Sequence, residues 1–210
     1  MDKLIQTLIS GLSLGSIYAL IALGYTMVYG IAKMLNFAHG DIIMVGAYAV
    51  ITAVFTMGLP PFIAILISIA LCALLGIVIE FLAYRPLRQA QPLAVLITAI
   101  GVSYLLQNLA LLIYGSEQKA FPTIVALPTV HIGGVYIDGI TLATLVVTAV
   151  IMVALSLFIN KTRMGKAMRA VSEDKEAAEL MGISVNRTIT VTFAIGSALA
   201  GVAAIFYGAA

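Results

Sequence analysis

The 210-residue chain has few charged residues and no tryptophan. Charged residues make up 10% of the sequence and apolar residues 62%, whereas a soluble domain carries about 25% charged residues. With so little polar material, a soluble globule would leave large apolar patches in water and would aggregate. We therefore expect the chain to fold in a lipid bilayer.

Other absences exclude whole classes of function. The single cysteine, Cys72, cannot form an intrachain disulfide, and no His/Cys/Asp/Glu group has the spacing of a metal site. Gly165-Lys166 lacks the upstream glycine and the following hydroxyl of a phosphate-binding loop. The net charge of +2 does not indicate the basic surface of a nucleic-acid-binding protein. We expect no metal, no cofactor in this chain, no nucleic-acid partner and no catalytic constellation.

Long charge-free runs divide the sequence into six candidate spans, because a helix needs about 20 apolar residues to cross the hydrocarbon core. A Gly-Leu-Pro-Pro turn at 58–61 separates the second span from the third. The spans are predicted at residues 4–30, 42–59, 62–83, 93–114, 140–159 and 188–210. The expected fold is all-α, a transmembrane helix bundle forming one domain over 1–210. Since the last span lacks a charged flank, we expect a C-terminal truncation.

The loops between the spans indicate the orientation of the bundle. Loop 160–188 contains six of the 11 lysines and arginines, so the positive-inside rule places it in the cytoplasm. Loop 115–139 is then external, and its alternating β-forming residues around a Gly-Gly pair predict a small hairpin over 130–137. Loop 84–92 is expected inside and the turn at 58–61 outside.

Residues 33–41 are polar and lie between two apolar runs. Asn36 and Gly40 are typical of helix ends, and Asp41 can cap a helix that starts at Ile42. Inside the membrane such a break must line a cavity or be buried in protein, and its free N–H groups would suit a carboxylate. If 25–41 re-enters from outside, the N-terminus is cytoplasmic. If 31–41 is instead a plain cytoplasmic turn, the N-terminus is external.

Residues 172–182 predict a short cytoplasmic helix, with Ser172 as its N-cap and Gly182 as its stop. A helix of about ten residues is unstable alone in water, so we expect it to dock on a partner or to lie on anionic lipid. Residues 163–169 are expected to continue the fifth span.

Two further patterns concern helix packing. Glu80, near the inner end of the third span, is expected to snorkel or to pair with a nearby arginine. Gly11 with Gly15, and Gly196 with Ala200, form small-xxx-small pairs that allow helices to approach closely.

Three segments resemble the permeases of bacterial branched-chain amino-acid ABC importers. They are residues 16–41, 83–87 and 163–183, and the resemblance extends over essentially the whole chain. Within the third segment, a Glu-Ala-Ala sequence followed by a glycine is similar to the EAA loop of ABC-importer permeases. In that family the loop forms a coupling helix that inserts into a groove of the ATPase.

The resemblance implies an inner-membrane subunit that works by alternating access. It would pair with a second permease, the same or different, with two ATPases that bind the ATP, and with a periplasmic or extracellular substrate-binding protein. The substrate would be leucine, isoleucine or valine, although the wider family also carries urea, short amides and sugars. A passive facilitator or channel with a re-entrant half-helix, or a structural subunit, would be the alternative.

The resemblance also implies functional residues and a topology. The translocation path would be formed by Asn36, Phe37, Ala38, His39, Gly40 and Asp41. The ATPase contact would be formed by Glu176, Ala177, Ala178 and Gly182, supported by Arg163, Gly165 and Arg169. A cytoplasmic N-terminus and a broken second membrane segment are favoured.

Overall fold

The computed structural model describes residues 2–122, 124, 128–132 and 135–209, and these residues are nearly all helical. The α-helices are α1 (Asp2–Ala32), α2 (His39–Ile51), α3 (Pro61–Ile79), α4 (Pro92–Tyr114), α5 (Gly139–Lys161), α6 (Arg163–Glu173), α7 (Lys175–Leu180) and α8 (Val185–Ala209). The π-helical turns η1 (Thr52–Thr56) and η2 (Glu80–Tyr84) extend α2 and α3, and the 3₁₀ turn η3 (Arg85–Leu87) follows η2. Strands β1 (Val130–Ile132) and β2 (Val135–Ile137) pair in an antiparallel hairpin.

Among the described residues, six helices are long and apolar enough to cross a membrane: α1, α2 with η1, α3 with η2 and η3, α4, α5 and α8. The predicted helix bundle with six spans is confirmed. The helices begin and end within a few residues of the charge-free runs, because each run must satisfy its own backbone hydrogen bonds in lipid. Ala210, the predicted end of the last span, and the Gly133-Gly134 turn of the hairpin lie outside the described residues.

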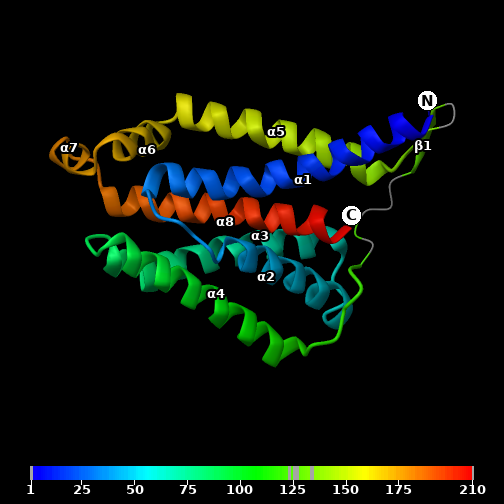
Figure 1. Ribbon diagram of the computed structural model, residues 1–210, viewed down its shortest axis with the longest axis horizontal. Helices are drawn as coiled ribbons and strands as arrows, with labels where there is room; N and C mark the ends of the chain where they lie inside the picture. The colour runs from blue at the N-terminus through cyan, green and yellow to red at the C-terminus, as the bar shows by residue number, and fades with distance from the viewer. Residues whose placement is uncertain (1, 123, 125–127, 133–134, 210) are drawn as a thin grey trace.

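Helix α8 occupies the centre of the bundle (Figure 1). It packs between α1 on one side and α2 and α3 on the other, while α5 lies outside α1 and α4 outside α2. Close packing is possible because small residues face each other. A Cβ atom added to Gly196 of α8 would lie 3.0 Å from the carbonyl oxygen of Gly24 in α1. The packing role predicted for Gly196 is confirmed.

The other small-residue pair does not have this role within the described chain. A Cβ atom added to Gly11 or to Gly15 would meet no heavy atom within 4 Å. Within the described chain, no helix therefore packs closely against these two glycines, and their expected packing role stays a prediction.

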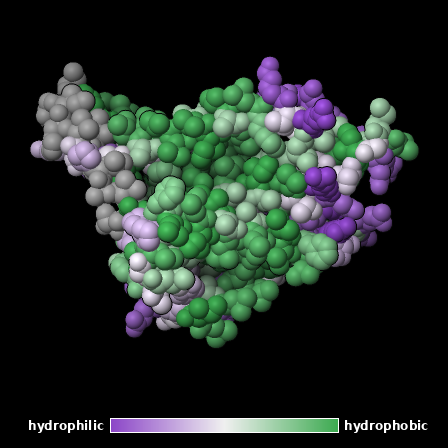
Figure 2. Space-filling view, turned by 180° about the vertical axis from the view of Figure 1, so that it is seen from behind, coloured by the Kyte–Doolittle hydropathy of each residue, from purple (hydrophilic) through white to green (hydrophobic). Residues whose placement is uncertain are grey.

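The face of the bundle seen in Figure 2 is apolar over most of its length. Hydrophilic residues gather at the end that carries α6 and α7, and a broad hydrophobic belt covers the helices between the two ends. This distribution is what a bilayer requires of a spanning protein, because charged side chains are costly at the level of the hydrocarbon.

The N-terminal part of α1 lies at the hairpin end of the molecule. The side-chain amide of Gln6 donates to the carbonyl of Tyr136 at 2.8 Å and accepts from the amide of Tyr136 at 3.0 Å. From there α1 runs without interruption to the end that carries α6 and α7 (Figure 1). The expected cytoplasmic N-terminus, on the same side as loop 160–188, is therefore wrong. The continuous 31-residue helix α1 lies between the N-terminus and the end that carries α6 and α7.

Candidate functional site

The helical backbone is interrupted directly after α1, and we call residues 33–38 the break. Lys33 has a φ of 58° and its amide donates to the carbonyl of Tyr29 at 2.9 Å, which is the left-handed cap that glycine most often supplies. Residues 33–36 are not helical, residues 37 and 38 form a turn, and α2 begins at His39.

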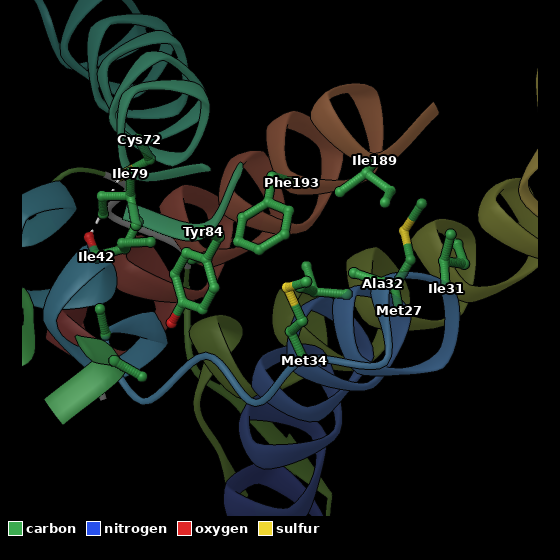
Figure 3. Close-up of a cluster of buried hydrophobic side chains, with 14 of the residues drawn as sticks. Met27, Ile31, Ala32, Met34, Ile42, Cys72, Ile79, Tyr84, Ile189 and Phe193 are labelled. Carbon is green, nitrogen blue, oxygen red and sulfur yellow. Dashed lines mark hydrogen bonds between the residues drawn. The ribbon is translucent and has the colours of Figure 1, made fainter. Parts of the chain in front are cut away.

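Helix α2 begins inside the bundle and not at its end (Figure 1). The thiol of Cys72, near the middle of the Pro61–Leu87 helical run, lies 3.4 Å from the carbonyl oxygen of Ile42 (Figure 3). The hydroxyl of Ser68 donates to the carbonyl of Gly46 at 2.9 Å. The break predicted within residues 31–41 is confirmed, and the chain approaches it from the α7 end.

Buried polar contacts hold the break. Asn36 is 2% exposed, and its side-chain oxygen accepts a hydrogen bond of 3.1 Å from the hydroxyl of Tyr84. The same hydroxyl lies 3.2 Å from the carbonyl oxygen of Leu35. The Tyr84 ring packs against Phe193 of α8 with 5.2 Å between the centroids (Figure 3). The non-helical backbone is thus buried in protein, as the absence of water in a bilayer requires.

Asp41 connects α2 to α4. Its carboxylate accepts a hydrogen bond of 2.9 Å from the side-chain amide of Gln107. Asp41 was expected to cap a helix starting at Ile42, but α2 begins three residues earlier, at His39, and Asp41 lies in its first turn. Gln107 was missed, although a glutamine within an otherwise apolar span is a recognisable signal.

The side chain of His39 points towards α1. A Cβ atom added to Gly24 would lie 2.9 Å from Cε1 of His39, and the imidazole stands edge-on to Tyr25 at 6.0 Å between the centroids. Since His39 is 3% exposed, its ring fills a notch between helices. The notch exists because Gly24 has no side chain.

A cavity of about 640 Å³ extends along α2 from the break to the loop that follows α4. Its lining includes Gly40 at the break, Met44 and Tyr48 farther along α2, and Glu117 and Lys119 in the loop. The cavity therefore has an apolar wall and a charged mouth. The two charged loop residues were not recognised as site residues in the sequence.

An aromatic stack borders the charged mouth of this cavity. The Tyr48 and Tyr114 rings are stacked with 4.1 Å between centroids. The ammonium of Lys119 lies 5.4 Å from the Tyr114 ring centroid, within the range of a cation–π contact. The hydroxyls of Tyr114 and Thr52 are 3.0 Å apart, which fixes the stack to η1.

The six residues of the predicted path lie in different surroundings. Phe37 and Gly40 are exposed on the surface of this chain. The other four are buried within it: Asn36, Ala38, His39 and Asp41. The structure brings all six to the break, but only Gly40 lines the cavity along α2.

The chain turns between α5 and α6. The Thr162 hydroxyl accepts from the amide of Gly165 at 3.0 Å and caps α6, while Thr162 itself is extended. A Cβ atom on Gly165 would lie 2.5 Å from the carbonyl oxygen of Phe158. Residues 163–169 therefore do not continue the fifth span as expected. They start a new helix packed back on α5, which only glycine at position 165 permits.

Helix α7 begins at a different cap from the one expected. The carboxylate of Asp174 accepts from the amides of Glu176 at 2.9 Å and Ala177 at 3.0 Å. Ser172 instead donates to the carbonyl of Arg169 at 2.7 Å, inside α6. Gly182 has a φ of 79°, and the predicted stop at this residue is confirmed.

The residues expected to contact an ATPase lie on α6, on α7 and just after α7. Glu176, Ala177, Gly182, Arg163 and Arg169 are exposed, whereas Ala178 and Gly165 are buried. Two exposed apolar residues were not among the expected contact residues. Leu180 and Met181, at the tip of α7, are 88% and 83% exposed. Apolar side chains this exposed at a polar end of a protein indicate a contact surface.

A buried ion pair joins η2 to the segment before α4, and two side chains of α8 bond to it. Glu80 is fully buried and accepts from Arg88, so the predicted pairing with a nearby arginine is confirmed. The hydroxyl of Thr190 donates to the same carboxylate at 2.7 Å, and Arg88 also donates to the side-chain oxygen of Asn186. Such a network must remain complete, because an unpaired charge is costly when buried.

The family described as "Branched-chain amino acid transport system / permease component" matches residues 7–210 of the chain. The chain belongs to this family. This permease is a multi-pass inner-membrane component of an ABC transport system, a class that works with ATPase and binding-protein subunits. The passive facilitator considered from the sequence is not favoured.

Several relatives support this assignment. The permease is 44% identical over 216 residues to the high-affinity branched-chain amino acid transport system permease protein BraD of Pseudomonas aeruginosa. It is 41% identical over 223 residues to the corresponding protein LivH of Escherichia coli K12. Each match covers 97% of this chain and 70% of the relative. A probable branched-chain amino acid transport permease of Methanocaldococcus jannaschii is 28% identical over 197 residues, with coverage of 90% and 61%. No solved structure matches the chain.

Proposed function

We propose that this permease imports leucine, isoleucine and valine by alternating access, driven by ATP that separate ATPase subunits bind and hydrolyse. It would act as one of two permease subunits, alike or different, and would receive substrate from a binding protein on the outer face. In this proposal the chain itself catalyses no reaction and holds no metal or cofactor. A permease for another small solute is the second possibility.

One contact carries the coupling part of this proposal. The ammonium of Lys175, the first residue of α7, donates to the carbonyl of Ala32 at 3.0 Å. Ala32 is the last residue of α1 and stands directly before the break. A displacement of α7 by an ATPase would therefore reach the break through a direct contact, without passing along a whole membrane span.

The cavity along α2 suits a zwitterion with a branched aliphatic side chain. Ile43 and Met44 supply apolar wall, while Lys119 and Glu117 offer opposite charges at the mouth for a carboxylate and an ammonium. Gly40 connects this cavity to the break. We therefore assign the cavity to the outer half of the path.

The tip of α7 provides the surface for the ATPase. Two apolar side chains, Leu180 and Met181, project beyond the bundle next to the acidic Glu176 and Glu179. Burial of a few large apolar side chains at the centre of an interface accounts for much of its binding energy. A groove in the ATPase would cover both.

The proposal can be tested on the whole transporter reconstituted in proteoliposomes with its binding protein. We expect uptake of labelled leucine that requires ATP and is reduced by isoleucine and valine, but not by urea or a sugar. Leu180→Asp should abolish ATPase co-purification and uptake, because a carboxylate replaces the apolar contact. Glu179→Ala, at an exposed neighbour, is the matched control and should retain both.

Two results would contradict the proposal. Uptake without ATP would indicate a facilitator. Full ATPase binding by Leu180→Asp would show that the tip of α7 is not the contact.

A further inference from the structure

A second cavity, of about 520 Å³, lies at the α7 end of the bundle. Three basic side chains line it, from the break, from the segment before α4 and from α7: Lys33, Arg88 and Lys175. Apolar residues including Met34, Leu93 and Leu96 form another part of its wall, and no acidic residue is among the described residues that line it. The cavity is therefore amphiphilic, with a cationic and an apolar part.

Two of the three positive charges are not compensated. Arg88 is neutralised by the carboxylate of Glu80. Lys175 uses one donor on the carbonyl of Ala32, which leaves two of its N–H groups free for another acceptor. Lys33 is exposed and has no ion pair among the residues that the structure describes. Burial lowers the pKa of Lys175, and the nearby charges of Arg88 and Lys33 lower it further.

The backbone of Lys33 adds an independent observation. It is the only non-glycine residue with a positive φ, 58°, in the described part of the chain. Glycine adopts this conformation at no steric cost, whereas a lysine is disfavoured there. Residues in such conformations cluster at functional sites. Among the residues that the structure describes, the ammonium at position 33 has no ion-pair partner.

We propose that this cavity binds an anionic phospholipid of the inner leaflet. Its phosphate would accept hydrogen bonds from Lys33 and Lys175, and an acyl chain would lie against Leu93 and Leu96 at the start of α4. Leu93 is 63% exposed and offers the apolar surface that the chain needs. The α7 end carries most of the basic residues, which places it at the cytoplasmic face, where anionic headgroups and basic side chains meet.

A lipid in this position would join the break to α7. Lys33 is the first residue after α1, and Lys175 is the first residue of α7. One phosphate between them would replace mutual repulsion by two attractive contacts. The lipid would therefore hold α7 against the end of α1, and we expect coupled transport to depend on anionic lipid.

The test uses the whole transporter, purified in mild detergent with equal amounts of phosphatidylglycerol and phosphatidylcholine, and native mass spectrometry of the retained lipid. We expect the wild type to retain phosphatidylglycerol preferentially. Lys33→Gly and Lys175→Met should each reduce that retention about fivefold, as expected for the loss of one cation near an anionic headgroup. Glycine readily adopts the positive φ of position 33, so misfolding would not explain a loss of lipid in Lys33→Gly.

The controls separate charge from position. Lys33→Arg should retain the lipid, and Lys161→Met, which removes an exposed charge from the end of α5, should leave retention unchanged. Wild-type retention by Lys33→Gly, or no preference for phosphatidylglycerol, would overturn the proposal. Displacement of the lipid by inorganic phosphate alone would identify a free anion as the occupant and would also overturn it.

Discussion

The ammonium of Lys175 donates a hydrogen bond of 3.0 Å to the carbonyl oxygen of Ala32, 143 residues earlier in the chain. The contact joins the first residue of α7 to the last residue of α1. A lysine is well placed there, because the unpaired carbonyls at a helix C-terminus carry partial negative charge. Helix α7 and the break that follows α1 are therefore neighbours in space.

The cap of α7 provides a test of coupling. Asp174→Ala removes the acceptor for the amides of Glu176 and Ala177, which should cost about 1 kcal/mol and unwind a helix of only six residues. We expect ATP hydrolysis to continue with less transport per ATP, measured as uptake and phosphate release on the same proteoliposomes. Ser172→Ala is the control, because Ser172 does not cap α7. Equal effects of both changes would argue against the cap.

Accessibility of the break can be measured with single cysteines. Gly40→Cys faces the cavity along α2 and has open space around its Cβ position, so a water-soluble thiol reagent should label it, with a rate that changes on ATP binding. Ala38→Cys should remain unlabelled, since Ala38 is fully buried. The native Cys72 is also fully buried and should give little background. Equal, ATP-independent labelling at both positions would contradict a gated path.

The buried ion pair predicts a compensating double variant. Arg88→Met leaves the buried carboxylate of Glu80 without its counter-ion and should destabilise the bundle by about 3–5 kcal/mol. Adding Glu80→Met should restore most of that stability, because no unpaired charge remains. Thermal unfolding in detergent measures both. If the double variant is as unstable as Arg88→Met, packing around η2 and not charge explains the loss.

The contact between α3 and α8 predicts opposite outcomes for two glycines. A Cβ atom on Gly76 would lie 2.5 Å from the Cβ atom of Ser197 and 3.0 Å from the carbonyl oxygen of Phe193. Gly76→Ala should therefore separate the helices and cost about 1–3 kcal/mol. Gly101→Ala in α4 meets nothing within 4 Å and should be neutral or stabilising by up to about 1 kcal/mol. Thermal unfolding of the two variants distinguishes them, and an unchanged Gly76→Ala would refute the close contact.

The helix boundaries set by single proline and glycine residues were predicted correctly from the sequence. Pro61 and Pro92 each begin a helix, and Gly182 stops one, because proline and glycine act through their own backbones. Caps are less certain, since several residues can serve. Ser172 and Asp174 are both good caps, and the extension of α6 to Glu173 decided between them. The side of the N-terminus was not determined by sequence, as the flank before the first span holds one lysine and one aspartate.

The sequence by itself determined that this is a membrane protein and the number of its spans, because composition acts on each segment separately. The cytoplasmic placement of loop 160–188 stays a prediction from its charge. Tertiary structure decided which side chains of the break face a cavity and which fill notches such as the one at Gly24. It also decided that Gln107 of α4 bonds to Asp41, and that Thr190 of α8 joins Arg88 at the carboxylate of Glu80. These contacts join residues far apart in the chain, and no local rule specifies which helices become neighbours.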